Sequence, residues 1–174
     1  KNKNINNFKK KIFNKQSKIS IMGLGYVGLP LALSFAKSGY NVHGYDIDRF
    51  KIHSIKKSKS YISSVSNYYL AKYKKKFKSS SNINHVENSD IIIICVPTPI
   101  NEKKLPILSH VKEVMHKLST IKVKHKLIIF ECTSYPGTTE EYFLPFIKKK
   151  KLRIGSNIFL GYSPEREDPG NKKF

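Results

Sequence analysis

The chain has 174 residues, with 33 Lys or Arg against 12 Asp or Glu, which gives a formal net charge of +21. This length, with 10 Tyr and 10 Phe, suits one domain with a packed core and excludes two full domains or wholesale disorder. The longest apolar run, residues 91–96, is far shorter than the roughly 20 residues of a membrane span, so we expect no membrane partner.

Residues 1–17 are expected to form a polar leader rich in Lys and Asn. The apolar residues of this leader are few: Ile5, Phe8, Ile12 and Phe13. They fit either one stripe of a helix or a frayed segment. The first residue is not Met and no apolar signal sequence follows it, so we expect a cytoplasmic piece of a longer protein.

Residues 18–174 are expected to form one domain that begins with a βαβ unit. Residues 18–22 predict a strand, and residues 23–28 predict a Gly-rich turn. Residues 29–39 predict a helix, with a Pro near its start and a Gly at its end, and residues 41–46 predict a second strand. Strand, turn, helix and strand therefore follow one another directly.

Strands and helices continue to alternate along the rest of the chain. Further helices are predicted over about residues 48–57, 67–78, 109–121 and 139–149. Further strands are predicted near residues 83–86, 91–96, 127–132 and 157–162. Residues 91–96 are apolar at every position, which is typical of a central parallel strand covered on both faces. The predicted fold class is α/β, with a doubly wound, mostly parallel sheet.

The first turn has the spacing Gly23-x-Gly25-x-x-Gly28, and Asp46 ends the second strand. Gly23 permits a tight turn, Gly25 lets the backbone approach a pyrophosphate, and Gly28 lets the helix pack close to the strand. Asp46 can accept hydrogen bonds from the hydroxyls of an adenosine ribose, and its charge would repel a 2′-phosphate. The unit predicts a Rossmann-like domain that binds NAD in preference to NADP.

Three more polar residues directly follow predicted strands: Thr98, Thr133 and Glu165. Because the carboxyl ends of parallel strands meet at one edge of a sheet, we expect these residues to surround one ligand crevice. Simpler roles stay open at this point. Thr98 could be a loop residue between two prolines, and Thr133 could cap a helix. Glu165 could pair with Arg166 at the surface.

Five segments make the chain recognisable when they are taken in order. They are IMGLGYVGLPLA (21–32), YDID (45–48), CVPTP (95–99), ECTSYPGTT (131–139) and YSPEREDPGN (162–171). Together they closely resemble the N-terminal domain of the UDP-glucose/GDP-mannose dehydrogenase family, over about residues 18–171. The form Ser-Pro-Glu-Arg, followed by Asp-Pro-Gly, is similar to the branch that acts on UDP-N-acetylhexosamines.

This resemblance implies oxidation of the C6 hydroxyl of a UDP-N-acetylhexosamine, UDP-N-acetylglucosamine above all, to a uronic acid with two NAD in succession. The implied cofactor-binding residues are Gly23, Gly25, Tyr26, Val27, Gly28, Asp46, Lys51, Thr98 and Thr133. The implied catalytic residues are Thr133 and Glu165, and the implied substrate-binding residues are Glu165 and Arg166. A carboxylate can act as a base or orient water, and a hydroxyl can relay a proton.

The chain departs from the family pattern in two ways. Where many members have Arg after the ribose-binding acid, this chain has Arg49 and then Lys51, and either cation could weaken the preference for NAD. The family's nucleophilic Cys, with its Lys and Asn partners, would lie beyond Phe174. Covalent catalysis needs a nucleophile near the carbonyl, so we expect residues 1–174 to bind NAD without completing the reaction. The resemblance also implies that the full-length protein is a homodimer or larger.

Other functions stay open. UDP-glucose or GDP-mannose is an alternative substrate, and a β-hydroxyacid or phosphogluconate-type dehydrogenase would share the same start. A different class, a nucleic-acid-binding module, would use residues 68–78, where aromatic residues are interleaved with Lys. Tyr69, Tyr73 and Phe77 recur every four residues, which is more typical of a packed helix face, so nucleic acid is the less expected partner.

The two cysteines, Cys95 and Cys132, lie inside apolar runs. Two cysteines exclude a disulfide framework, and no close Cys/His spacing predicts a zinc site. We therefore expect no metal and two thiols buried in the core.

Overall fold

The computed structural model describes residues 2–164, which form an α/β fold around a six-stranded sheet in the order β3-β2-β1-β4-β5-β6. Every neighbouring pair of strands is parallel. The strands are β1 (Lys18–Met22), β2 (Asn41–Tyr45), β3 (Phe77–Ser80), β4 (Ile91–Ile94), β5 (Lys126–Phe130) and β6 (Ile158–Tyr162). The helices are α1 (Asn2–Phe13), α2 (Gly28–Lys37), α3 (Arg49–Lys56), α4 (Asn67–Tyr73), α5 (Asn84–Glu87), α6 (Ser109–Ser119) and α7 (Thr138–Lys149). The doubly wound parallel sheet expected from the sequence is confirmed.

The predicted βαβ unit is present as β1, α2 and β2. Strand β1 pairs with β2 from Lys18 opposite Asn41 to Met22 opposite Tyr45. Helix α2 buries its apolar stripe against these strands, because apolar residues recur at three- and four-residue intervals along it. The helix ends before Gly39, which has a φ of +99° and so permits the left-handed turn that leads into β2.

Two apolar clusters form the core, one on each face of the sheet. One cluster joins β1, β2 and β3 to buried residues of α2, α3 and α4. The other joins β4, β5 and β6 to buried residues of α5, α6 and α7. Strand β4 contributes to both, with Ile91 and Ile93 in the first cluster and Ile92 and Ile94 in the second. Burial on both faces explains why this strand is apolar at every position.

The segment between residues 67 and 86 differs from the sequence-based prediction. The helix predicted over residues 67–78 ends at Tyr73, and the strand predicted near residues 83–86 is a helical turn, α5. The missing strand is β3, in which Phe77 pairs with Val42 and is only 3% exposed. The four-residue spacing was misleading, because Tyr69 stacks on Tyr73 within α4 whereas Phe77 is buried by pairing with β2.

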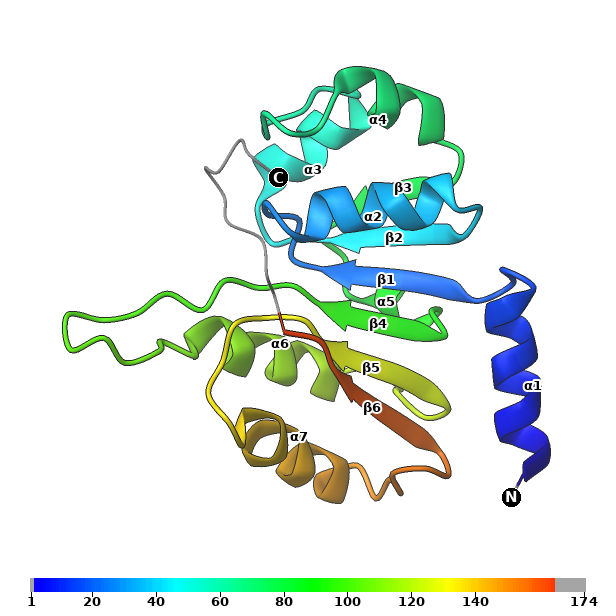
Figure 1. The fold of residues 1–174 in the computed structure, drawn as a ribbon, viewed down its shortest axis with the longest axis vertical. Helices are drawn as coiled ribbons and strands as arrows, with labels where there is room; N and C mark the ends of the chain where they lie inside the picture. The colour runs from blue at the N-terminus through cyan, green and yellow to red at the C-terminus, as the bar shows by residue number, and fades with distance from the viewer. Residues whose placement is uncertain (1, 165–174) are drawn as a thin grey trace.

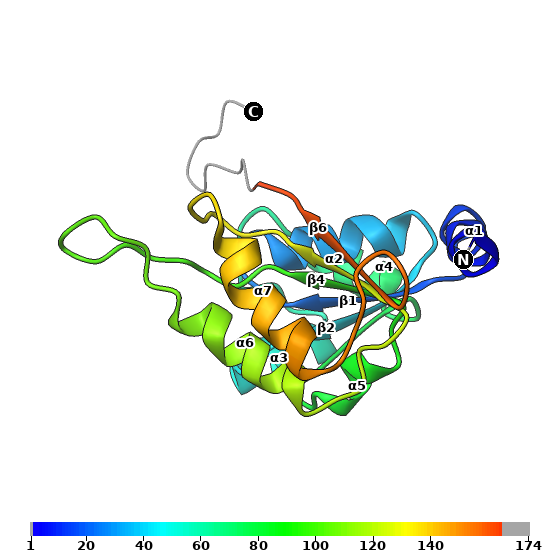
Figure 2. The same ribbon diagram turned by 90° about the horizontal axis from the view of Figure 1, so that it is seen from below.

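Because all six strands run the same way, the sheet has an amino edge, where the strands begin, and a carboxyl edge, where they end. Helix α1, within the polar leader, lies at the amino edge, and the connection between β4 and α6 projects from the carboxyl edge (Figures 1 and 2). Phe8 of α1 stacks on Phe159, with ring centroids 5.7 Å apart, and Lys11 pairs with Asp90 at 3.1 Å. Among residues 2–164, no helix combines the length and apolar content needed to cross a bilayer.

Candidate functional site

A cavity of about 640 Å³ opens at the carboxyl edge, between the end of β1 and the neighbouring strand ends. It collects residues from the Gly-rich turn, from the ends of β2, β4 and β5, and from α6. The residues predicted from the sequence that line it are Gly23, Gly25, Tyr26, Val27, Asp46, Lys51, Thr98 and Thr133. Residues separated by more than 100 positions in sequence therefore share one crevice, as expected for strand ends in a parallel sheet.

The Gly-rich turn is packed so tightly that side chains are excluded at two of its three glycines. A Cβ on Gly28 would lie 1.8 Å from the carbonyl oxygen of Gly23, and a Cβ on Gly23 would lie 2.6 Å from the carbonyl oxygen of Cys95. Gly23 also has a φ of +95°, which disfavours any L side chain. At Gly25 a Cβ would meet nothing within 4 Å, so the protein leaves open space there. That space lies beside the start of α2, where backbone amides favour an anion.

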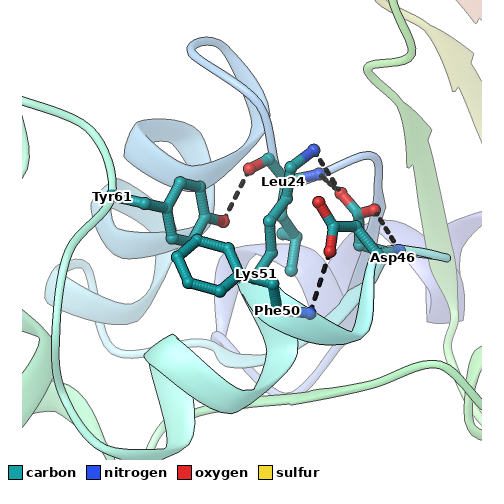
Figure 3. A network of polar contacts seen from close by, with 6 residues as sticks. Leu24, Asp46, Phe50, Lys51 and Tyr61 are labelled. Carbon is teal, nitrogen blue, oxygen red and sulfur yellow. Dashed lines mark hydrogen bonds and ion pairs between the residues drawn. The ribbon is translucent and has the colours of Figure 1, made fainter.

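The carboxylate of Asp46 is held by three protein donors, as Figure 3 shows for two of its partners, Leu24 and Lys51. The backbone N–H of Leu24 donates to Oδ2 at 2.8 Å, and Lys51 Nζ donates to the same oxygen at 3.2 Å. The backbone N–H of Asp48 donates to Oδ1 at 2.9 Å. A carboxylate offers about four acceptor sites, so Oδ1 retains one for a ligand hydroxyl. Asp46 is only 6% exposed, and its three donors fix the direction of the carboxylate within the cavity wall.

Tyr61 stabilises the same turn from a loop between α3 and α4, a contact that the sequence did not indicate. Its hydroxyl donates to the carbonyl oxygen of Leu24 at 2.7 Å (Figure 3). Burial, with the nearby charges of Asp46 and Asp48, raises the pKa of the Tyr61 hydroxyl above its usual range. The hydroxyl therefore stays protonated and keeps its role as the donor.

Thr98 and Thr133 come together although 35 residues separate them. The Oγ1 hydroxyl of Thr98 donates to the backbone carbonyl of Thr133 at 2.5 Å. Thr98 follows β4 and Thr133 follows β5, and these two strands are paired in the sheet. The helix-cap alternative for Thr133 is wrong, because the N-cap residue of α7 is Gly137. The Thr133 side chain is exposed at the mouth of the cavity.

Comparison with known proteins identifies relatives of this chain in sequence and in structure. A model of the UDP-glucose/GDP-mannose dehydrogenase family, NAD binding domain, matches residues 17–173. The chain belongs to the UDP-glucose/GDP-mannose dehydrogenase family. A curated relative, UDP-N-acetyl-D-glucosamine 6-dehydrogenase of Pseudomonas aeruginosa, is 36% identical over 162 residues, which cover 91% of this chain and 37% of the relative. The chain thus spans little more than a third of that relative's length.

Solved structures give the same assignment. UDP-D-ManNAc dehydrogenase from Pyrococcus horikoshii superposes with a TM-score of 0.81 at 33% identity, covering 88% of this chain and 37% of that one. A ternary complex of GDP-mannose dehydrogenase from Pseudomonas aeruginosa gives a TM-score of 0.80 at 26% identity, covering 87% of this chain and 36% of that one. The family resemblance read from the five sequence segments is therefore confirmed, and NAD is the cofactor of this family's domain.

The cavity fits the cofactor of the UDP-glucose/GDP-mannose dehydrogenase family. The open space above Gly25 suits a pyrophosphate, and the remaining acceptor of Asp46 suits a ribose hydroxyl. The described residues contain no group of three or more His, Cys, Asp or Glu side chains placed to hold a metal ion. The cavity combines open space for a pyrophosphate at Gly25 with a hydrogen-bond acceptor at Asp46, as a dinucleotide needs.

Three polar residues of α6 also line the cavity, and sequence reasoning missed them: His110, Glu113 and Lys117. They recur at three- and four-residue intervals and so share one helix face. Burial, followed by the charges of Glu113 and Asp46, raises the pKa of Tyr45, which lines the same wall. The spacing of His110, Glu113 and Lys117 beside the apolar stripe of α6 is the sequence signal that could have predicted this polar face.

Glu165 and Arg166, which were predicted to act on the substrate, lie outside the described residues. The chain leads towards the cavity edge up to that point, because β6 ends at Tyr162 and Ser163 N–H donates to the Phe130 carbonyl at 3.0 Å. Their roles in this family member stay a proposal.

Proposed function

We propose that the chain is the cofactor-binding part of a dehydrogenase that oxidises the C6 hydroxyl of a UDP-N-acetylhexosamine to a carboxylate. UDP-N-acetylglucosamine is the favoured substrate. The single observation that supports this proposal best is the convergence of the Gly-rich turn, Asp46 and the Thr98–Thr133 pair on one cavity. Such a convergence at the carboxyl edge is the arrangement that dinucleotide chemistry requires.

Each residue has a role suited to its chemistry. Gly23, Gly25, Tyr26, Val27 and Gly28 would surround the pyrophosphate, and Asp46 would accept a hydrogen bond from the adenosine ribose. Lys51 would hold the Asp46 carboxylate in place through its 3.2 Å ion pair. Its cation lowers the net negative charge at the ribose, so the preference for NAD over NADP is moderate.

The reactive end of the site would lie near the threonine pair. Because the Thr98 hydroxyl already donates to the Thr133 carbonyl, Thr98 would position that loop, and the Thr133 hydroxyl would hold or move a proton near the substrate. Glu165 would orient water or accept a proton, and Arg166 would contact the substrate. NAD, when bound, accepts hydride, and oxidation of an alcohol to a carboxylate consumes two NAD and one water.

The preference for an N-acetylated sugar rests on two findings. Two curated relatives at 36% identity, from Pseudomonas aeruginosa and Salmonella typhi, are named UDP-N-acetyl-D-glucosamine 6-dehydrogenases, and a third, from Methanococcus aeolicus, is named UDP-N-acetyl-D-mannosamine dehydrogenase. The chain also has the segment Ser163-Pro-Glu-Arg166, followed by Asp-Pro-Gly. UDP-N-acetylmannosamine, UDP-glucose and GDP-mannose are the competing substrates to test.

Two measurements test the proposal. Calorimetric titration of the chain should show NAD binding more tightly than NADP, and Asp46→Asn should reduce that difference. In the protein that carries this chain, UDP-N-acetylglucosamine should produce NADH faster than UDP-N-acetylmannosamine, UDP-glucose or GDP-mannose at equal concentration. NAD binding without NADH formation from any of these sugars would contradict the dehydrogenase assignment. A faster rate with UDP-glucose would contradict only the choice of sugar.

A further inference from the structure

Exposed lysines gather along the amino edge of the sheet, opposite the cofactor cavity. The segments that lead into β2, β3, β5 and β6 all carry them, and so does α1. The members of this group, which we call the lysine edge, are Lys9, Lys10, Lys15, Lys37, Lys74, Lys75, Lys76, Lys122, Lys124, Lys148, Lys149 and Lys151. None of them is needed for the proposed cofactor site.

Specific contacts hold these segments side by side. Lys150 Nζ donates to the Ile121 carbonyl at 3.0 Å, which joins the end of α7 to the turn before β5. Tyr40 donates to the Ile12 carbonyl at 2.9 Å, which joins α1 to the turn before β2. Figure 1 shows α1 running past the starts of several strands. Together with the stacking of Phe8 on Phe159, these contacts place α1 beside β6 and the turn before β2, and the end of α7 beside the turn before β5.

Acidic residues do little to neutralise this surface. Among the described residues, Glu87 and Asp90 are the acids that precede a strand, and both are engaged by the protein. Asp90 accepts from Lys11 Nζ at 3.1 Å and from Lys18 N–H at 2.9 Å, and Glu87 accepts from Lys122 N–H at 3.2 Å. The other described acids belong to segments that leave strands, or to α6 and α7: Asp46, Asp48, Glu102, Glu113, Glu131, Glu140 and Glu141. Apart from Glu87 and Asp90, the described acids therefore lie away from the lysine edge.

An exposed aromatic side chain, outside the core, lies beside the lysine edge. Phe13, the last residue of α1, is 82% exposed, whereas Phe8 and Ile12 of the same helix pack against the domain. An exposed Phe beside several lysines is the combination found where a helix meets the headgroup region of an anionic bilayer. Lysines suit that surface because each cation near an anionic leaflet contributes about 1 kcal/mol of attraction.

We propose that the lysine edge binds the surface of an anionic lipid bilayer, with Phe13 inserted at the level of the headgroups. The cavity lies at the opposite edge of the sheet, so this orientation leaves it open to solution. The proposal concerns a bilayer surface and involves no membrane-spanning segment. It therefore revises the sequence-based expectation of no membrane partner, which was drawn from the length of the apolar runs alone. It is independent of the sugar that the protein oxidises.

Vesicle flotation tests the charge part of the proposal. The chain should bind vesicles of equal parts phosphatidylcholine and phosphatidylglycerol, and should not bind vesicles of phosphatidylcholine alone. The double substitution Lys9→Gln, Lys10→Gln should weaken binding about thirtyfold, from roughly fivefold for each lysine near an anionic surface. The matched control is Lys103→Gln, Lys104→Gln, two exposed lysines in the connection between β4 and α6, and it should bind as the parent does.

The aromatic part separates a bilayer from other polyanions. Phe13→Ser should weaken vesicle binding about tenfold at unchanged charge, whereas Phe50→Ser, at a residue 66% exposed near the carboxyl edge, should not. Equal thermal midpoints of unfolding would show that all variants are folded, whether or not NAD binds. Equal losses from both lysine pairs, or no loss from Phe13→Ser, would overturn the proposal. Tighter binding to a DNA duplex than to the anionic vesicles would overturn it in favour of a nucleic acid.

Discussion

The two edges of the sheet are built from the same strands and yet have opposite character. At the carboxyl edge, the turns that follow the strands carry glycines, an acid and hydroxyl groups. These residues surround a cavity. At the amino edge, lysine-rich segments lead into the strands and α1 packs beside them. The difference follows strand direction: residues just after the strands form the cavity proposed for the cofactor, and residues just before them carry the exposed lysines. Four predictions test this contrast, in order of decreasing effect.

The largest effect is expected at Gly28. Gly28→Ala would place a Cβ 1.8 Å from the Gly23 carbonyl oxygen, so the turn must move. We expect a loss of about 3 kcal/mol in the free energy of unfolding, together with loss of NAD binding. Urea denaturation and calorimetry would measure the two losses.

Gly25→Ala is the matched control within the same turn. Its Cβ would meet no protein atom within 4 Å, so the free energy of unfolding should change by no more than about 0.5 kcal/mol. NAD affinity should nevertheless fall about tenfold, because the methyl group occupies the space proposed for the pyrophosphate. Unchanged NAD affinity in Gly25→Ala would contradict that placement.

The second prediction concerns Asp46. Asp46→Asn removes a charge and turns one acceptor into a donor that faces a backbone N–H, either of Leu24 or of Asp48. We expect NAD affinity to fall by about 2 kcal/mol, measured by calorimetry. Asp48→Asn changes the formal charge equally and keeps the cap on α3, since Asn is also a good N-cap. Similar losses in both variants would show that overall charge, rather than the Asp46 contact, determines the affinity.

The third prediction concerns the interior between the two edges. His43 of β2 stacks on His85, with ring centroids 4.9 Å apart, and burial, then the charge of His85, lowers its pKa from 6.5 to about 4. The unfolded chain therefore takes up a proton more readily than the folded one between these pH values. The free energy of unfolding should fall as pH drops from 6.5 towards 4, by about 2 kcal/mol after solvent screening of the partly exposed ring.

Chemical denaturation across this pH range measures the effect. His43→Gln should flatten the pH dependence, while His116→Gln, at an exposed position on α6, should leave it unchanged. NAD affinity at neutral pH should stay the same in both variants, because neither residue lines the cavity. A steep pH dependence that persists in His43→Gln would contradict the assignment.

The smallest effect is expected at Lys51. Lys51→Gln removes the 3.2 Å ion pair with Asp46, in which the lysine side chain is 30% exposed, and should cost NAD affinity less than about 1 kcal/mol. NADP affinity should fall further, because a cation that would attract the 2′-phosphate is lost. Lys56→Gln, at the far end of α3, is the control. A rise in NADP affinity in Lys51→Gln would contradict this role.

Much of the fold could be predicted because its signals are local. The βαβ unit was predicted from a short strand, a Gly-rich turn and a helix with a terminal Gly, all within 29 residues. Strand β3 could not be predicted in this way, because Phe77 is a strand residue through its pairing with Val42 and not through its neighbours. The sequence of the leader was likewise compatible with a helix or a frayed segment. Helix α1 is held by contacts with Phe159 and Asp90, which lie far along the chain and give no local signal.

The candidate site divides in the same way. The proximity of Thr98 and Thr133 could be predicted because the carboxyl ends of parallel strands meet at one edge, a rule that needs no knowledge of distant contacts. Lys51 was predicted as a cofactor-binding residue, but its ion pair with Asp46 depends on the geometry of α3 and was not predicted. Tyr61 had no sequence signal, because it reaches Leu24 from a loop 37 residues away. The polar face of α6 could have been recognised from spacing alone.

Nuclear magnetic resonance titration of the isotopically labelled chain with NAD can decide whether the cofactor binds at the carboxyl edge. We expect shifts in the backbone amides of residues 23–28 and 46–48 and of Val96 and Thr98, with none in α1 or residues 122–126. Shifts confined to the lysine edge, or an unshifted amide at Gly25, would contradict the placement of the cofactor at the carboxyl edge.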